Sequence, residues 1–510
     1  MVHALDIQLA SGSEVPLFQQ IADAITRRIH LGALPPATRL PPTRDLADAL
    51  GTHRNTVVRA YEALVESGFV VSHVGRGTFV AAVAARPPSA VTPLEPAGLP
   101  WAALMSRSVG SEALRRGDRV ATRRPPPDAI NLGRFEPGED VRPAEGLRRC
   151  IDHVLRRYGS KVLGYAPREG VRELRVAIAA DLVRRGIPAT ADEVMVTSGS
   201  QQALDLLARA FIDPGDTFLV EEPTYAGVLN LLSAAGARPI GVPGDLEGPD
   251  PEALDQLTQK PWRDEHRPRV KGFYVMPNGS NPTGRTVTLE RRRALVQWSR
   301  RSGVPIIEDD YGADMYLDDP PPPALRALDG QVIYVSTFSK KLSPALRIGF
   351  MVAPAGLQRE LIPLKHAMDL GSSALLQHAL AEFMERGYLA AHLAKIRPHY
   401  RERRDALCDA LTEHLPREIA FERPNAGVLL WLRLPHSVDP ELAFEAARRH
   451  GVMVTPGNVN SVSGSGAGGL RLAFCTEPPE RLREAARRLG VALRESLEQA
   501  DTQEPRTELV

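Results

Sequence analysis

The chain has 510 residues, enough for two or more domains, and its 43% hydrophobic and 25% charged residues are ordinary for a globular protein. No apolar run approaches the roughly 20 residues that span a membrane, and the first residues lack the segments of a secretion signal, so we expect a cytoplasmic protein. A net charge of +1 gives no support by itself to nucleic-acid binding. The three cysteines have neither metal-ligand nor disulfide-framework spacing, so we expect reduced thiols and no metal site.

The N-terminal part of the chain has the pattern of short helices followed by a hairpin. Apolar residues from Leu17 to Ile29 recur at helical spacing and predict a first helix. A second helix is expected at 44–50, with Thr43 as its N-cap and Gly51 at its end, and a third from Arg54 to Ser67. Two helices separated by a short turn that contains glycine are typical of a helix-turn-helix.

The third helix has an apolar side and a polar beginning. Val57, Ala60 and Leu64 share the inward side, which leaves four polar residues near the exposed start, namely Arg54, Asn55, Thr56 and Arg59. Such side chains bind phosphates and base edges when a recognition helix enters the major groove of double-stranded DNA. Two short strands are then expected around a tip of Gly75, Arg76 and Gly77, as in a wing. Residues 1–80 balance seven arginines against seven acidic residues, so a winged helix that makes only protein contacts stays open as an alternative.

One continuous stretch carries a family resemblance. LPPTRDLADALGTHRNTVVRAYEALVESGFVVSHVGRGTFV resembles the GntR family of winged-helix regulators, and the resemblance extends over residues 14–81. It implies DNA contacts by Arg44, Arg54, Thr56 and the Gly75–Gly77 tip. His53 departs from the family pattern, which usually has a serine as the N-cap of the recognition helix. Since imidazole is a poorer cap than a hydroxyl, the resemblance predicts a less stable helix start, or capping by Thr52.

The rest of the chain predicts a linker and then a large α/β domain. Residues 81–128 are rich in Pro, Ala and Arg and are expected to be a linker. From 129 to 497, near-continuous apolar strands alternate with helical patterns, which favours a mostly parallel sheet covered on both faces. The polar residues 498–510 are expected to be a disordered tail. The expected strands are Glu193–Thr197, Thr217–Glu221, Val270–Met276, Val304–Glu308, Val332–Ser336 and Ile348–Val352.

A lysine follows one of these strands at the edge where parallel sheets bind ligands. Lys340 comes after the strand Val332–Ser336, and the chain has only seven lysines in which to place an imine-forming amine. Its neighbour Lys341 is an equal candidate on spacing alone. A lysine that serves only the surface is the ordinary alternative for either position.

Further residues have the chemistry that pyridoxal phosphate requires. Asp309 and Tyr311 share one side of an extended segment, where an acid could hold the pyridine nitrogen and a hydroxyl the ring oxygen. Ser200 and Gln201 begin a helix expected at Gln201–Phe211 and could bind the phosphate through backbone N–H groups. The remaining candidates are Arg347 for the phosphate, Tyr225 for stacking on the ring, Asn281 for the ring oxygen and Arg471 for a carboxylate.

The order of the motifs carries more weight than each motif alone. VTSGSQQALDLLARAFIDPGD, EEPTYAG, NPTG, PIIEDDYGADMY, STFSKKLSPALRIGFMVAP and LRLAF resemble the fold-type-I aminotransferases over residues 130–495. The resemblance implies an α/β fold with a small C-terminal subdomain and pyridoxal 5'-phosphate as cofactor. It makes Lys340 the Schiff-base lysine, Asp309 the pyridine-nitrogen partner, Tyr311 and Asn281 the ring-oxygen partners and Tyr225 the stacking ring. It makes Ser200, Gln201, Ser339 and Arg347 the phosphate ligands and Arg471 the binder of an effector carboxylate.

The two halves together are similar to the MocR/GabR regulators. Tyr165, in LGYAPREGVRELR, would then reach the phosphate of a partner subunit, which requires a homodimer. The resemblance implies a regulator that senses the cofactor or an amine or amino-acid effector and binds an operator with two half-sites. Asn281-Pro-Thr-Gly and Gly312-Ala-Asp-Met-Tyr depart from the usual regulator pattern, and the former is the form found in active transaminases. A working aminotransferase that carries a DNA-binding domain is therefore the second hypothesis.

Overall fold

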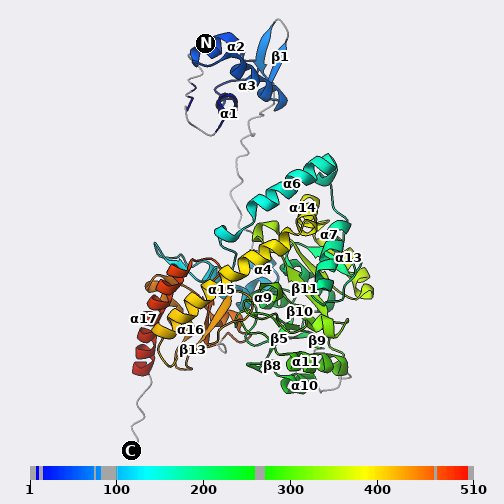
Figure 1. Ribbon diagram of the computed structural model, residues 1–510, viewed down its shortest axis with the longest axis vertical. Helices are drawn as coiled ribbons and strands as arrows, with labels where there is room; N and C mark the ends of the chain where they lie inside the picture. The colour runs from blue at the N-terminus through cyan, green and yellow to red at the C-terminus, as the bar shows by residue number, and fades with distance from the viewer. Residues whose placement is uncertain are drawn as a thin grey trace, which may run out of the picture. The chain divides into compact units, whose positions relative to one another are not determined.

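The computed structural model describes residues 7, 9–10, 15–73, 76–81, 99, 101–258, 270–464 and 468–503. The chain divides into two compact units, Met1–Trp101 and Ala102–Val510 (Figure 1). Each unit has a hydrophobic core of its own. No helix among these described residues is long and apolar enough to cross a membrane.

The first unit is a winged helix. Its core joins buried residues of all three helices to the ends of the hairpin, including Ile21, Leu46, Leu64 and Val80. The hairpin strands pair antiparallel, with Val70 opposite Val80. The elements are α1 (Leu17–His30), α2 (Thr43–Ala49), α3 (Arg54–Glu66), β1 (Val70–His73) and β2 (Gly77–Val80).

The two helix starts differ from expectation. Thr43 was expected as the N-cap of the second helix, and this is wrong, because α2 already begins at Thr43 and the N-cap position is taken by Pro42, whose ψ of 143° is extended. His53, by contrast, does cap α3, since its Nδ1 accepts a hydrogen bond of 3.2 Å from the backbone N–H of Asn55. The expected weakness at this position is therefore offset by a direct cap.

The second unit is built on a seven-stranded sheet. Its strand order is β4-β12-β11-β10-β9-β5-β6, and every neighbouring pair is parallel except the two that involve β12. The six predicted strands lie within two residues of observed strands, and β6 was missed. The strands are β4 (Val194–Thr197), β5 (Thr217–Glu221), β6 (Arg238–Val242), β9 (Val270–Val275), β10 (Ile306–Asp309), β11 (Ile333–Thr337) and β12 (Gly349–Val352).

Helices cover both faces of this sheet, as predicted. Successive residues of β9 alternate between the two sides: Phe273 and Val275 pack with Trp298 of α11 (Leu289–Ser302), while Tyr274 belongs to the core on the side of α8 (Ser200–Phe211). The other helices of the large domain are α6 (Ala144–Tyr158), α7 (Arg172–Arg184), α9 (Ala226–Ala234), α10 (Pro251–Thr258), α12 (Leu325–Leu328), α13 (Ala355–Asp369) and α14 (Ala374–Glu385).

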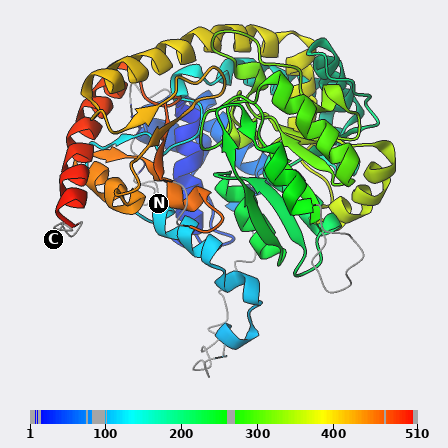
Figure 2. The same cartoon turned by 90° about the horizontal axis from the view of Figure 1, so that it is seen from below.

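A smaller C-terminal subdomain completes the unit. The long helix α15 (Tyr388–His414) leads to it and packs along α17 (Pro479–Gln503), as Figure 2 shows. Its four-stranded sheet has the order β13-β14-β17-β16. The strands are β13 (Ala420–Phe421), β14 (Leu429–Arg433), β16 (Thr455–Pro456) and β17 (Gly469–Ala473), with α16 (Pro440–Arg449) beside them and β15 (Val452–Met453) paired to β3 (Ile130–Asn131).

Two expectations about loose segments are corrected. Residues 498–503 continue α17, because Leu493 and Leu497 keep its apolar side packed on the core; residues 504–510 lie outside the described residues. The linker was expected to run to residue 128, but α4 (Trp101–Leu104), the short turn η2 (Arg107–Gly110) and α5 (Glu112–Ala121) are helical. Most of residues 82–100 lie outside the described residues.

Helix α5 and the residues just after it are attached to the C-terminal subdomain by two arginines. Arg116 donates to the backbone oxygens of Asn458 and Val462 at 3.2 and 3.4 Å, in and just after the turn η7 (Gly457–Asn460). Arg123 forms an ion pair of 2.7 Å with Glu445 of α16. The basic composition that suggested a solvated linker therefore serves to attach this segment.

Candidate cofactor and DNA-binding sites

The two neighbouring lysines have opposite surroundings. Lys341 is 2% exposed, and its ammonium pairs with Asp314 at 2.5 Å, so its charge is already neutralised. The Nζ of Lys340 donates to the backbone oxygen of Phe135 at 2.7 Å and lies 4.1 Å from the centre of the Phe135 ring. Burial lowers the pKa of Lys340 to about 8, which increases the fraction of neutral, nucleophilic amine near neutral pH. The structure thus favours Lys340 as the reactive amine.

Asp309 ends β10 with one carboxylate oxygen unused. Its Oδ2 accepts from the hydroxyl of Tyr274 at 2.8 Å, whereas its Oδ1 is buried without a hydrogen-bond partner among the described residues. Burial raises the pKa of Asp309 to about 7, and the charge of Lys340 acts in the opposite direction. An unpaired buried oxygen normally costs free energy, so this atom fits a protonated ring nitrogen.

Asn281 and Tyr311 lie on the same side as Asp309. The amide Nδ2 of Asn281 is also buried without a partner, while its Oδ1 accepts a long bond of 3.4 Å from Arg471. The hydroxyl of Tyr311 donates to the backbone oxygen of Gly279 at 2.5 Å, and its ring meets Phe135 edge-on. Asn281 therefore offers a free donor, whereas Tyr311 is engaged within the chain.

Three of the four predicted phosphate ligands, Ser200, Gln201 and Arg347, lie at the beginning of α8. Gly199 precedes the helix with a φ of +84°, and Ser200 and Gln201 form its first turn, whose backbone N–H groups have no acceptors within the helix. Arg347 donates to the backbone oxygen of Ser198 at 2.9 Å, which sets its guanidinium beside this turn. Ser339, 6% exposed, lies on the segment that leads to Lys340. The arrangement has the donors and positive charge that an anion needs.

Tyr225 lies at the start of α9, and its hydroxyl donates to the side chain of Gln201 at 3.1 Å. Burial raises the pKa of this phenol, and the negative charge of Asp309 contributes to the same effect. The aromatic ring is thus held between the anion-binding turn and the buried acid, where a flat cofactor ring would need a stacking partner.

Arg471 of β17 is a half-buried cation, with a buried Nε, that has no acidic partner among the described residues. It donates to the backbone oxygen of Gly133 and to Oγ1 of Thr455, both at 2.9 Å, and its Nε has no hydrogen-bond partner. It forms no ion pair with any acidic side chain that the structure describes. Since a buried guanidinium is normally paired, Arg471 fits the carboxylate of a ligand.

These residues fit pyridoxal phosphate. An amine with a lowered pKa, an acid with a free oxygen, an amide with a free donor, an aromatic ring and an anion-binding turn lie around one region of the sheet edge. Tyr165 is the exception, because it is 85% exposed and joins none of these groups within one chain.

The DNA-binding candidates lie on the first unit. Arg44, Arg54, Asn55 and Arg76 are exposed, and Thr56 is half-buried. Arg54 donates to Oγ1 of Thr43 at 3.5 Å, which holds the starts of α2 and α3 together. Arg59 is exposed but stacks on the Phe18 ring of α1 at 4.4 Å, and Gly75 lies outside the described residues.

Three residues at these sites were not expected. Phe135 binds the amine of Lys340, and Tyr274 binds Asp309, but nothing in their sequence surroundings distinguished them from ordinary core aromatics. Arg39 packs against Gly77 of the wing, where any side chain in place of Gly77 would come within 2.9 Å of its guanidinium. Its position just before the helix-turn-helix was the one available signal for Arg39.

Known protein families match both units. The model for aminotransferases of class I and II matches residues 130–489, and the model for bacterial regulatory proteins of the gntR family matches residues 17–80. The "Probable rhizopine catabolism regulatory protein MocR" of Rhizobium meliloti is 34% identical over 489 residues, 94% of each chain. The chain belongs to the MocR-type regulators.

Relatives of this MocR-type regulator also include enzymes. The 2-aminoadipate transaminase of Thermus thermophilus is 34% identical over 373 residues, which cover 72% of this chain and 91% of that protein. The crystal structure of a multiple substrate aminotransferase from Thermococcus profundus aligns with a TM-score of 0.73 at 30% identity, over 79% of this chain and all of that one. These matches leave out the winged helix, so they bear on the second unit alone.

Proposed function

We propose that this MocR-type regulator acts in the cytoplasm as a homodimer, binds an operator with two half-sites and responds to an amine-bearing carboxylate at its pyridoxal-phosphate site. The proposal rests chiefly on Arg471, a half-buried guanidinium whose buried Nε has no hydrogen-bond partner and which has no anionic partner among the described residues, beside an amine and an acid that fit the cofactor. A ligand carboxylate would give Arg471 the charge that the chain does not provide.

The residues would divide the work as follows. When bound, pyridoxal phosphate supplies an aldehyde that condenses with primary amines. Lys340 holds it through an amine that is largely neutral above pH 8, and Asp309 keeps a proton on the ring nitrogen. Asn281 and Tyr225 orient the ring, while Ser200, Gln201, Ser339 and Arg347 bind the phosphate.

A second copy of the chain would complete the site. Tyr165 is 85% exposed, and Leu163 beside it is 67% exposed, which is unusual for large apolar side chains two residues apart. We propose that Tyr165 enters the site of the partner and binds its phosphate. The two winged helices of such a dimer would bind two half-sites. Each would use Arg44, Arg54, Asn55, Thr56, Arg59 and the Gly75–Gly77 tip.

An active aminotransferase is the second candidate. It is favoured by the enzymes among the relatives and by Arg471 together with the free amide of Asn281, because substrate carboxylates need the same groups.

One pair of assays separates these functions. Gel shifts on the DNA upstream of the chain's own gene, with and without pyridoxal phosphate and amino acids, should show cofactor- or ligand-dependent binding. Multiple turnover with amino acids and 2-oxoglutarate should be absent or slow. Fast turnover together with ligand-independent DNA binding would instead establish the enzyme.

A further inference from the structure

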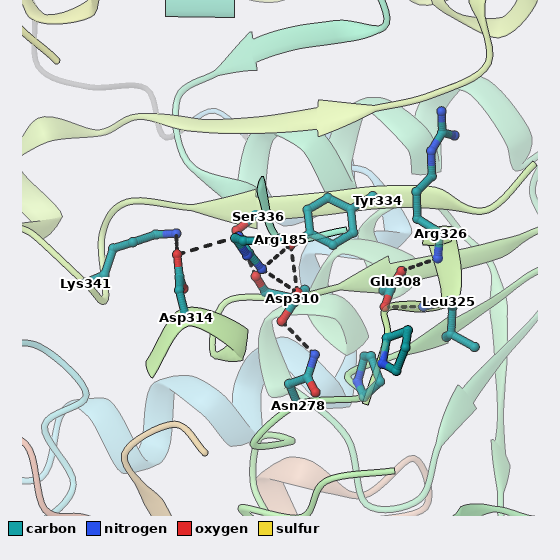
Figure 3. A network of polar contacts seen from close by, with 12 residues as sticks. Arg185, Asn278, Glu308, Asp310, Asp314, Leu325, Arg326, Tyr334, Ser336 and Lys341 are labelled. Carbon is teal, nitrogen blue, oxygen red and sulfur yellow. Dashed lines mark hydrogen bonds and ion pairs between the residues drawn. The ribbon is translucent and has the colours of Figure 1, made fainter. Parts of the chain in front are cut away.

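The neighbours of the two central cofactor residues face away from the cofactor region. Asp309 is followed by Asp310 and Lys340 by Lys341, and both of these neighbours are buried. Asp310 binds Tyr334 and Asn278, and Lys341 binds Asp314, whereas Asp309 and Lys340 bind Tyr274 and Phe135. The buried neighbours Asp310 and Lys341 therefore belong to a polar network that is separate from the contacts of Asp309 and Lys340 (Figure 3).

Asp310 is hydrogen-bonded through both its side chain and its backbone. Its Oδ2 accepts from Tyr334 at 2.7 Å and from Arg185 at 3.2 Å, and its Oδ1 accepts from Asn278 at 3.0 Å. Its backbone N–H donates to Val335, and its backbone oxygen accepts from Ser336 at 2.7 Å. Because residue 310 is fixed in this way, the peptide that joins it to Asp309 is fixed as well.

Arg185 connects this aspartate to the lysine pair. The guanidinium lies 3.2 Å from Asp310 and 3.6 Å from Asp314, and it donates to the hydroxyl of Tyr334 at 3.1 Å. Asp314 in turn pairs with Lys341 at 2.5 Å. Burial alone would raise the pKa of Asp314, but Lys341 and Arg185 outweigh it and lower that pKa to about 2.

Arg185 comes from outside the sheet. It follows the last residue of α7, so the two aspartates on the sheet side are bound to a cation from the helical layer. Two positive charges, the partly buried Arg185 with a side chain 20% exposed and the buried Lys341, thus balance two buried negative charges, Asp310 and Asp314. Removal of one of the four would leave a buried charge without its partner.

We propose that Arg185 is a positioning residue for the cofactor site: by joining Asp310 to Asp314 it fixes Asp309 and Lys340 relative to each other. The inference rests on the proposed function in one respect, that Asp309 and Lys340 bind pyridoxal phosphate. Loss of Arg185 should therefore weaken cofactor binding although its side chain contacts no cofactor-binding side chain.

The test compares neighbouring arginines in the full-length chain. Arg185→Met removes the charge at similar length, and Arg185→Lys keeps the charge but loses the second contact. Arg184→Met is the matched control, because the Arg184 side chain is 67% exposed and its one ion pair within the described part of the chain is with Asp181. The readouts are the Kd for pyridoxal phosphate and the pH titration of its visible-edge absorption band.

Arg185→Met should raise the Kd between about 10- and 100-fold, as loss of a supporting partner commonly does, and should shift the midpoint of the pH titration. Arg185→Lys should fall between Arg185→Met and the unmodified chain, and Arg184→Met should match the unmodified chain. An unchanged Kd and titration in Arg185→Met would overturn the proposal. If the unmodified chain itself binds no pyridoxal phosphate, the proposed function fails instead.

A rescue experiment covers the case in which Arg185→Met does not fold. Arg185 lines a cavity of about 770 Å³ together with Asp310, Asp314 and Asn278, so a small solute can reach its place. Guanidinium ion, at concentrations too low to unfold the protein, should restore cofactor affinity to Arg185→Gly and leave Asp309→Ala unchanged. Absence of rescue in a folded Arg185→Gly would contradict the proposal.

Discussion

Lys340 and Lys341 are adjacent, yet only one of them has an ammonium without an acidic partner within the described residues. Lys340→Ala should abolish the visible-edge absorption of the bound cofactor at every cofactor concentration. Lys341→Ala should keep the band at lower affinity, because Asp314 loses its partner but the amine of Lys340 remains. A band that survives in Lys340→Ala and disappears in Lys341→Ala would show that the assignment is wrong.

The lowered pKa of Lys340 gives the site a defined pH dependence. A lysine with a pKa of about 8 is roughly one-tenth neutral at pH 7, far more than an ordinary lysine. The rate at which apo-protein condenses with pyridoxal phosphate should therefore rise with pH and level off above about 8. A rate that continues to rise beyond pH 10 would indicate an unperturbed amine.

Arg471 distinguishes sensing of a ligand from sensing of the cofactor alone. Arg471→Ala should blunt the DNA-binding response to carboxylate-bearing amines and spare pyridoxal phosphate binding. Arg433→Ala on the adjacent strand β14 is the control, because Arg433 is exposed and pairs with Glu422. An equal response in both variants would imply an effector without a carboxylate, or the cofactor itself as the signal.

At the scale of single elements, the cap of α3 offers a direct test. His53→Ala should destabilise the start of the helix by about 1 kcal/mol, whereas His53→Ser should restore a cap. Hydrogen exchange at the Asn55 amide, the donor to His53, should accelerate in the alanine variant. Equal protection in His53→Ala and the unmodified chain would mean that the imidazole contributes nothing.

The anion-binding turn depends on close contact with β12. A methyl group on Gly349 would lie 2.6 Å from the backbone carbon of Gly199 and 2.7 Å from the backbone nitrogen of Ser200. Gly349→Ala should therefore destabilise the protein by about 1–3 kcal/mol, the usual cost of overpacking, and weaken phosphate binding. Gly356→Ala, which meets nothing within 4 Å, should leave the Kd of the cofactor unchanged.

Apolar periodicity was sufficient to predict the core strands but not the elements at the margins. The strand β5 was predicted to the residue, because all five of its side chains are buried. The strand β6 was missed because it lies at the edge of the sheet, is only partly buried and contains Pro239. Helix α5 was taken for linker because its Arg116 binds backbone oxygens 342 and 346 residues further along the chain, which no local pattern reveals.

Only part of the candidate site could be proposed from the sequence. Position and chemistry suggested residues at strand ends and helix starts, such as Asp309 and Ser200. Spacing alone could not decide between Lys340 and Lys341, and only the family resemblance favoured Lys340, because the difference depends on Asp314 pairing with Lys341. Phe135 contributes through its backbone oxygen, which any residue would supply, and through its ring, which no local pattern distinguishes from an ordinary core aromatic.

At the scale of the whole molecule, tight DNA binding should require both winged helices, because each has little net charge. An operator with two half-sites should bind the full chain at least about 100-fold more tightly than a single half-site, because the second contact becomes intramolecular. Titrations on DNA with one and two half-sites measure this directly. Equal affinity for both would contradict the dimeric arrangement.

Helix α5 is connected, through one segment of the chain, to Arg471 and to the loop before Tyr225. The segment 455–464 binds Arg116, and it also binds Arg471 through Thr455 and the loop before Tyr225 through Asn460 and Thr224. Arg116→Ala should therefore leave cofactor absorption unchanged but reduce the effect of ligand on DNA affinity. Arg115→Ala on the same helix is the control, and a full ligand response in Arg116→Ala would remove α5 from the pathway.

The attachment of α5 also limits the distance between a winged helix and the second unit of the same chain. Ala81 and the start of α5 at Glu112 are 31 residues apart, and a chain of that length extends at most about 110 Å, whereas the 48 residues first assigned to the linker would extend to about 170 Å. Each winged helix must then bind its half-site within that distance of the second unit of its own chain. Inserting residues between 82 and 98 should widen the range of half-site spacings that the protein accepts, and removing residues there should narrow it.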